Sequence, residues 1–278
     1  MHLISVYPII KGNWASELQY WSKTDILPGS LIKVPLKGKE IFALVFKSAS
    51  IQEAKSEIKG ADFKIRKIDN PERIDILRPE YVHAAVQAST YFVQPVGSML
   101  KAVIPSIALD HLTPLAKAAD AAKNKAAGSE SEQAETISDI VAVSTNKDDR
   151  LSVYKSLIRE VLARKKSLIL VGPTVRIVEE LFESTTKGIE HVSVLLHGSL
   201  SKKKMDDAWE SALEGGDGQS KDNRGKIIVC TPQYMCIPRM DIETIIMEKE
   251  SSRAYKTFQP PYFDWRTFAE IYSKLLGT

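Results

Sequence analysis

The sequence predicts an α/β protein in two parts, a small β-rich domain over residues 1–107 and a parallel-sheet α/β lobe over residues 145–278. Short segments rich in β-branched and aromatic residues, separated by turn dipeptides, occupy the chain as far as Ile68. Helical and strand patterns alternate from Val153 onward, and the expected strands are wholly apolar. An alanine-rich stretch separates the two patterns, so we expect it to be a linker.

Four strands are expected in the first domain, and Pro28-Gly29 and Lys37-Gly38 mark turns between them. The strand segments are Leu3–Ile10, Leu31–Leu36, Ile41–Phe46 and Phe63–Ile68. Short strands closed by turns favour a small barrel or a curled sheet. Beyond Pro79, apolar residues recur at intervals of three and four, which predicts a helix that packs over the sheet.

Residues 108–144 are expected to link the two domains. Eight of the twenty residues from 116 to 135 are alanine, and the whole stretch carries three Lys+Arg against six Asp+Glu. The flanking domains are mildly basic, with 14 cations against 10 acids before the linker and 21 against 19 after it. This distribution permits binding to a polyanion without requiring it.

The second domain alternates helical stripes with apolar strands. The stripes are Val153–Leu162, Val175–Phe182 and Met205–Leu213, and the strands are Leu168–Val171, Val192–Leu196, Ile227–Cys230 and Ile242–Met247. Strands that are apolar on both faces are typical of a parallel sheet covered by helices on both sides. Nucleotide-binding lobes have this build, as do many other folds.

Composition excludes several classes of protein. Of the 278 residues 44% are apolar and 26% charged, and the net charge is +3. No apolar run approaches the roughly 18 residues that a membrane span needs, and no secretory signal is visible. Two cysteines, Cys230 and Cys236, and histidines without metal-ligand spacing predict no disulfide framework, no metal site and no cofactor. We therefore expect a cytoplasmic protein that has no membrane partner.

Several motifs, in their order along the chain, resemble one family. The run Tyr91–Pro105 resembles the end of the N-terminal DNA-binding domain of primosomal protein N′, the replication restart helicase. Pro28–Pro35 followed by Ile41–Phe46 resembles an earlier strand pair of that domain. Three further segments are similar to its H-S-G-L-S turn, its V-x-G-T-R-S…P segment and its I-I-V-D-E-E-H-D-S-S-Y-K motif: Leu196–Ser201, Ile228–Pro238 and Ile245–Lys256.

The resemblance implies a degenerate, shortened relative that keeps a 3′ DNA-binding domain and one helicase-like lobe. In the family, F-D-Y helps form a pocket for the last nucleotide of a 3′ strand, and Leu18-Gln19-Tyr20 stands in its place here. V-P-F-G is replaced by Val34-Pro35-Leu36-Lys37, and Lys64 matches a basic pocket position. The candidate DNA-binding residues are Gln19, Tyr20, Lys37, Gly38, Lys39 and Lys64.

The pocket residues differ from the family pattern in ways that bear on end recognition. Gln19 removes the acid that would be a strong acceptor for a 3′-hydroxyl, and Lys37 fills space that glycine leaves open. We therefore expect the preference for a free 3′ end to be weak, while general phosphate contact by lysines persists. A solvated, charged strand rim without DNA contact is the alternative interpretation.

The family's motor motifs are lost at two separate places. Where the family has G-S-G-K-T, which holds phosphates and Mg²⁺, this sequence has Lys147-Asp148-Asp149-Arg150-Leu151. In D-E-E-H the first acid holds Mg²⁺ and the second positions the attacking water; here Glu248 and Lys249 stand in those places. The resemblance implies a P-loop NTPase-like lobe without its P-loop, retained for structure or binding rather than for ATP hydrolysis.

These observations favour a non-enzymatic DNA-binding protein of replication restart or repair that binds single-stranded or forked DNA. Two alternatives stay open. In the first, the lobe is an adaptor that docks replisome or primosome proteins, and DNA contact is incidental. In the second, the chain is a helicase or ATPase subunit completed by another chain, which the missing phosphate loop disfavours.

Overall fold

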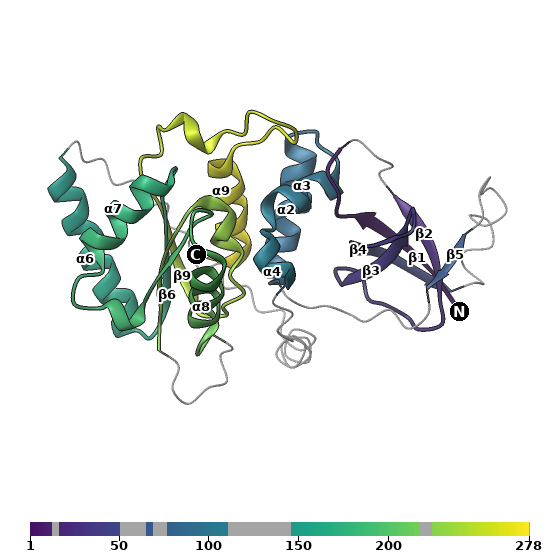
Figure 1. Ribbon diagram of the computed structural model, residues 1–278, viewed down its shortest axis with the longest axis horizontal. Helices are drawn as coiled ribbons and strands as arrows, with labels where there is room; N and C mark the ends of the chain where they lie inside the picture. The colour runs from purple at the N-terminus through teal and green to yellow at the C-terminus, as the bar shows by residue number, and fades with distance from the viewer. Residues whose placement is uncertain (13–16, 51–64, 69–76, 111–145, 217–223, 278) are drawn as a thin grey trace.

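The computed structural model describes residues 1–12, 17–50, 65–68, 77–110, 146–216 and 224–277. An N-terminal β-sheet, a central group of helices and a C-terminal α/β lobe follow one another along the long axis of the molecule (Figure 1). The fold class predicted from the sequence, a small β-rich part followed by a parallel-sheet α/β lobe, is confirmed.

The N-terminal sheet has five strands in the order β3-β4-β1-β2-β5. They are β1 (His2–Pro8), β2 (Leu18–Ser22), β3 (Leu31–Leu36), β4 (Lys39–Ser50) and β5 (Arg66–Ile68). All neighbours are antiparallel except β2 and β5, which are parallel. The sheet is curled, so that β2 and β3 approach each other although β4 and β1 lie between them in the strand order. The hydroxyl of Tyr20 on β2 donates to the carbonyl of Pro35 on β3, 2.9 Å away.

Buried apolar residues lie on both faces of the sheet, because successive side chains of a strand point to opposite faces. Ile32, Ala43 and Val45 point to the inside of the curl. Leu31 and Leu44 point to the other face and join the core beneath the central helices. A sheet buried on one face by its own curl and on the other by helices needs no partner to cover it.

Strand β2 is not predicted from the sequence, and β1 ends at Pro8, two residues before the expected end at Ile10. The predicted strand at Phe63–Ile68 is described only from residue 65, and β5 begins at Arg66. The predicted Lys37-Gly38 turn joins β3 to β4 as a two-residue hairpin loop, with Leu36 paired to Lys39. Both turn residues have positive φ, 48° and 80°, as a type I′ turn requires.

Three helices form the middle of the molecule: α2 (Pro79–Tyr91), α3 (Val96–Val103) and α4 (Ser106–Asp110). The helix predicted beyond Pro79 is present as α2, but it packs most extensively against the C-terminal helix and not over the sheet. That position belongs to α3, which begins against the end of β1. A Cβ at Gly97 would lie 2.0 Å from the carbonyl oxygen of Pro8, so only glycine allows this approach.

The lobe contains a parallel sheet in the order β7-β8-β6-β9. Its strands are β6 (Ser167–Val171), β7 (Ser193–Leu196), β8 (Ile227–Cys230) and β9 (Ile242–Met247). Helices α6 (Lys147–Ala163) and α7 (Val175–Thr185) cover one face, and α8 (Lys202–Leu213) and α9 (Trp265–Leu276) cover the other (Figure 1). Short 3₁₀ turns lie at η1 (Glu190–Val192), η2 (Pro232–Cys236) and η3 (Arg253–Tyr255).

Each predicted strand of the lobe is present within one residue of its expected bounds, whereas α9 was not predicted from the sequence. No helix within the described residues is long and apolar enough to cross a membrane.

Candidate functional site

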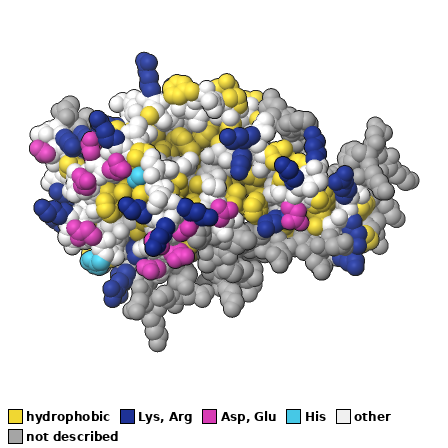
Figure 2. Space-filling model, in the orientation of Figure 1, with side chains coloured by type: hydrophobic (Ala, Val, Ile, Leu, Met, Phe, Trp, Pro, Cys, Tyr) yellow, Lys and Arg dark blue, Asp and Glu magenta, His cyan; other side chains and the backbone are white. Residues whose placement is uncertain are grey.

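The surface of the N-terminal sheet is basic. Across residues 1–12, 17–50 and 65–68 the structure exposes eight cationic side chains and three acidic ones. The cations are Lys11, Lys23, Lys33, Lys37, Lys39, Lys47, Arg66 and Lys67, and the acids are Glu17, Asp25 and Glu40. Figure 2 shows Lys and Arg side chains distributed over the end of the molecule that holds this sheet. A surface with this excess of cations attracts a polyanion such as a nucleic-acid backbone.

The hairpin between β3 and β4 places two predicted DNA-binding lysines at an exposed tip. Lys37 and Gly38 form its turn and Lys39 begins β4, and all three are exposed. No atom lies within 4 Å of a Cβ built on Gly38, so the backbone of the turn is open to a ligand. Lys64, the fourth basic candidate, lies outside the described residues.

Gln19 and Tyr20 occupy neighbouring positions of β2 and therefore face opposite sides of the sheet. Gln19 is half-buried, whereas Tyr20 is 4% exposed and packs in the core inside the curl. Burial raises the pKa of the Tyr20 hydroxyl, which donates its hydrogen bond to Pro35. The geometry thus gives Tyr20 a structural contact that closes the sheet, and its predicted role toward DNA stays a prediction.

Sequence reasoning did not single out four cations of the same surface, on β3, β4 and β5: Lys33, Lys47, Arg66 and Lys67. Lys33 lies between buried Ile32 and Val34, and its ammonium is 5.5 Å from the centre of the Phe42 ring. Lys33 is the one charged residue of an otherwise apolar strand, and this is the signal that could have identified it as outward-facing.

In the lobe, the residues that the resemblance aligns with a phosphate loop, Lys147–Leu151, form the first turns of α6. Asn146 caps this helix, because its side chain accepts a hydrogen bond from the N–H of Asp148. Asp148 and Asp149 lie in the first turn, where negative charge stabilises the positive end of the helix dipole. Lys147–Leu151 is therefore a well-formed helix start with two carboxylates where the family has a glycine-rich loop.

The two segments that resemble motor motifs meet in one ion pair. Arg150 donates to both carboxylate oxygens of Glu248, at 2.8 Å from Nη2 and 2.9 Å from Nε. The hydroxyl of Tyr154, one turn further along α6, donates to Glu248 Oε2 at 2.7 Å. Glu248 is 3% exposed and Arg150 16%. Hydrogen bonding to Glu248 raises the pKa of Arg150, and burial followed by the bond to Glu248 raises the pKa of Tyr154.

Tyr255 fixes the backbone on the other side of Glu248. Its hydroxyl donates to the carbonyl oxygens of Glu248 at 2.7 Å and Val171 at 3.1 Å, and the N–H of Glu248 donates to the same Val171 carbonyl. Burial raises the pKa of the Tyr255 hydroxyl, which remains protonated as a donor. The carboxylate of Glu248 is thus held from both the side chain and the backbone.

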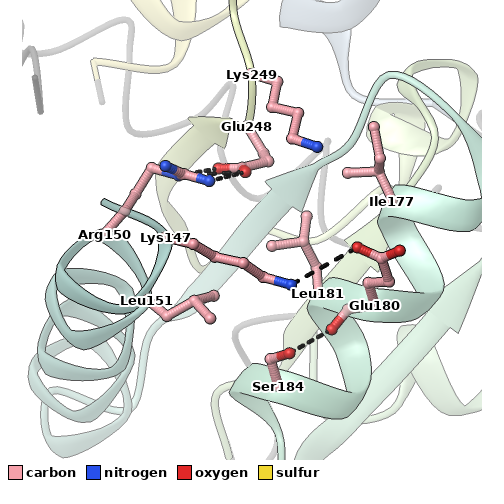
Figure 3. Close-up of a pocket in the computed structure, with 9 residues that line it drawn as sticks. All are labelled: Lys147, Arg150, Leu151, Ile177, Glu180, Leu181, Ser184, Glu248 and Lys249. Carbon is pink, nitrogen blue, oxygen red and sulfur yellow. Dashed lines mark hydrogen bonds and ion pairs between the residues drawn. The ribbon is translucent and has the colours of Figure 1, made fainter. Parts of the chain in front are cut away.

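The space beside this ion pair is small. A pocket of about 40 Å³ lies between α6, α7 and the end of β9 (Figure 3). In Figure 3 the Arg150 side chain reaches across to Glu248, while Lys147 pairs with Glu180 at 3.8 Å. Ligand pockets for small molecules usually measure about 300–1,000 Å³, so this one has room for little more than a water molecule or two.

Comparison with known proteins first gives the class of the N-terminal part. Residues 9–105 match the family model described as 3′DNA-binding domain (3′BD). That range extends from the end of β1 through α3, and it contains the basic hairpin and all the predicted DNA-binding residues.

Over most of its length the chain is similar in sequence to two proteins named replication restart protein PriA. It is 20% identical over 259 residues to PriA of Helicobacter pylori strain J99 and 19% identical over 259 residues to that of strain 26695. In each case the match covers 91% of this chain and 38% of the relative. The resemblance drawn from the sequence motifs is thereby confirmed.

Proposed function

We propose that this chain is a non-enzymatic DNA-binding protein of replication restart or repair, and that it binds single-stranded or forked DNA through its N-terminal sheet. The observation that carries the proposal is the coincidence of the 3′DNA-binding domain match with the excess of exposed cations over the same residues. The relatives named replication restart protein supply the process.

The absence of enzyme activity in the proposal is supported by the Arg150–Glu248 ion pair. To bind a nucleoside triphosphate, a site needs backbone N–H groups and a cation that contact the phosphates, and a carboxylate that is free to ligate Mg²⁺. Here the Arg150 guanidinium is bonded to Glu248, and Glu248 also accepts from Tyr154. Asp148 and Asp149 at the start of α6 add like-charge repulsion toward phosphate.

A titration with fluorescent DNA tests the binding proposal. Forked, single-stranded and blunt duplex DNA of equal length are compared by fluorescence anisotropy, using the full chain. We expect the forked and single-stranded probes to bind more tightly than the blunt duplex. Equal affinity for all three would contradict the proposed preference, and no binding at low salt would favour the adaptor alternative.

Charge variants locate the interface. Lys37→Asn combined with Lys39→Gln removes two cations from the hairpin tip, and Lys202→Gln combined with Lys203→Gln removes two exposed cations from the start of α8 in the lobe. We expect the hairpin pair to weaken binding by about 10-fold, as loss of two phosphate contacts would, and the α8 pair to have a much smaller effect. The opposite order would place the interface on the lobe.

Preference for a free 3′ end is tested with forks that differ only in a 3′-hydroxyl or a 3′-phosphate. We expect similar affinities because Gln19 replaces the family's acid. Discrimination above about tenfold, or 1.4 kcal/mol, would show a working end pocket.

Nucleotide handling is tested by thermal unfolding and by phosphate release. We expect Mg²⁺–ATP to leave the Tm unchanged, since a ligand that binds only the folded state would raise it. DNA-stimulated phosphate release by the purified chain, abolished by Arg150→Ala, would overturn the non-enzymatic part of the proposal and leave the DNA-binding part standing.

A further inference from the structure

Helix α2 contributes to the core of the lobe although it precedes residues 111–145 in sequence. The ring of Tyr81 on α2 lies edge-on to two rings of α9, with centroids 5.2 Å from Phe268 and 5.0 Å from Tyr272. All three side chains are fully buried. Aromatic rings of this size remove large apolar areas from water, and here the two segments bury each other's rings.

A polar contact crosses the same boundary. Arg78, just before α2, donates from Nη1 to the carbonyl oxygen of Arg239, 2.8 Å away. Arg239 is fully buried, pairs with Asp241 at 2.8 Å, and donates to the carbonyls of Ala212 and Glu214. Arg78 therefore donates across the boundary to the backbone of a buried network that joins α8 to β9.

The apolar core is continuous from the sheet to the lobe. One cluster of buried residues includes Leu31 and Leu44 of the N-terminal sheet, Met99 and Leu100 of α3, and Met235 of η2. Helix α4 also contacts α8. In Figure 1 the helices α2, α3 and α4 stand between the sheet and α9, and α2 packs on α9.

We propose that residues 77–110 fold as a single unit with residues 146–216 and 224–277, and that this unit carries the N-terminal sheet through α3. The contact between the two parts, rather than the covalent connection, holds them together. The molecule is then not divided into two independent domains at residue 107, where the sequence predicts the first domain to end. The basic sheet and the lobe move as one body, so DNA bound at the hairpin keeps a fixed position relative to the lobe.

Cutting the chain tests this directly. A site-specific protease sequence is inserted after Gly128 in the full chain, the purified protein is cleaved, and the product is analysed by size-exclusion chromatography after dilution to about 1 µM, which separates fragments that bind more weakly than that. We expect one peak containing both fragments, in low and in high salt, because the contact is mainly apolar. Two separate peaks would overturn the proposal.

Two matched variants show which contact is responsible. Phe268→Ala truncates a ring at the boundary, whereas Leu181→Ala truncates a buried side chain of α7 on the far face of the lobe sheet. After cleavage, we expect Phe268→Ala to raise the dissociation constant of the fragments at least about 100-fold and Leu181→Ala to change it less than tenfold. Equal effects of the two variants would show that α9 is not the docking surface.

A second measurement uses the uncut protein and is independent of those variants. Two single-tryptophan proteins, one keeping Trp21 on β2 and the other Trp209 on α8, are unfolded in urea. In each protein we expect the fluorescence midpoint to coincide with the midpoint of the far-ultraviolet circular dichroism, as for one cooperative unit. A fluorescence midpoint that differs from the circular dichroism midpoint of the same protein would show that sheet and lobe unfold separately and would overturn the proposal.

Discussion

Glu248 is a nearly buried carboxylate held by two side chains, Arg150 and Tyr154, and by the backbone bond from Tyr255. A charge buried in this way is stable only while its partners remain, because desolvation is repaid by pairing and hydrogen bonding. The residues that resemble motor motifs therefore form one structural unit at the point where α6, β6 and β9 meet.

A double-mutant cycle measures the strength of this ion pair. Arg150→Met leaves the Glu248 carboxylate buried without its cation and should lower the free energy of unfolding by about 3–5 kcal/mol. Glu248→Leu should cost less, because the partly exposed Arg150 can turn to water. The double variant Arg150→Met/Glu248→Leu should recover most of the loss, as measured by urea unfolding; additive losses would contradict a coupled pair.

Lys37 combines an unfavourable backbone with a favourable charge. Its φ of 48° lies in the left-handed region, which costs an ordinary residue roughly 1–2 kcal/mol, whereas Asn-Gly is a preferred pair for such a turn. Lys37→Asn should therefore raise the free energy of unfolding by about 0.5–1 kcal/mol while weakening DNA binding. If the substitution lowers both stability and affinity, lost binding would reflect a damaged hairpin and not a lost contact.

Two residues set the ends of helix α9. Asp264 caps its N-terminus by accepting a hydrogen bond from the N–H of Arg266, and Gly277 ends it in the left-handed conformation with φ of 74°. Its buried face consists of Trp265, Phe268, Ala269 and Tyr272. Spacings of three and four residues carry the signal for this helix, although the sequence analysis did not predict it.

The cap of α9 gives a pH dependence. Burial opposes ionisation of Asp264, but hydrogen bonds from the side chain and the N–H of Arg266 outweigh it and hold the pKa of the carboxyl below its usual value. Because the folded pKa is lower than the unfolded one, this stabilisation is complete above about pH 4 and is lost as the pH falls through the folded pKa.

Asp264→Asn keeps an acceptor at the cap but removes the charge. It should lower the free energy of unfolding by about 1–2 kcal/mol at neutral pH and should reduce the further loss of stability as the pH falls below about 4. Chemical unfolding at several pH values checks this; an unchanged acid slope in the variant would show that other carboxylates cause the acid sensitivity.

Across the whole molecule, the proportion of cations differs between the two ends of the described surface. The N-terminal sheet has eight exposed cations against three acids, whereas residues 146–216 and 224–277 expose 16 cations against 11 acids. Fewer acids therefore offset the attraction of DNA at the sheet than at the lobe.

This distribution predicts the salt dependence of binding. If the sheet neutralises about three phosphates, the logarithm of the association constant should fall with the logarithm of salt concentration with a slope of about −2 to −3. Replacing Lys37 and Lys39 should reduce the magnitude of the slope by the contribution of about two phosphate contacts, whereas replacing Lys202 and Lys203 of α8 should leave the slope unchanged. A flat response to salt in the wild-type protein would rule out phosphate contact as the main source of affinity.

The sequence by itself determined the fold class, the strands of the lobe, the Lys37-Gly38 turn and the resemblance to PriA, because strand alternation, turn residues and motif order are local properties of the chain. Only the tertiary structure decided that Arg150 and Glu248, 98 residues apart, pair with each other, that Tyr20 closes the curled sheet, and that α2 packs on α9. The physical reason is that burial and hydrogen bonding between distant segments depend on which faces meet in space. The residue spacing within one segment does not indicate which other segment it will contact.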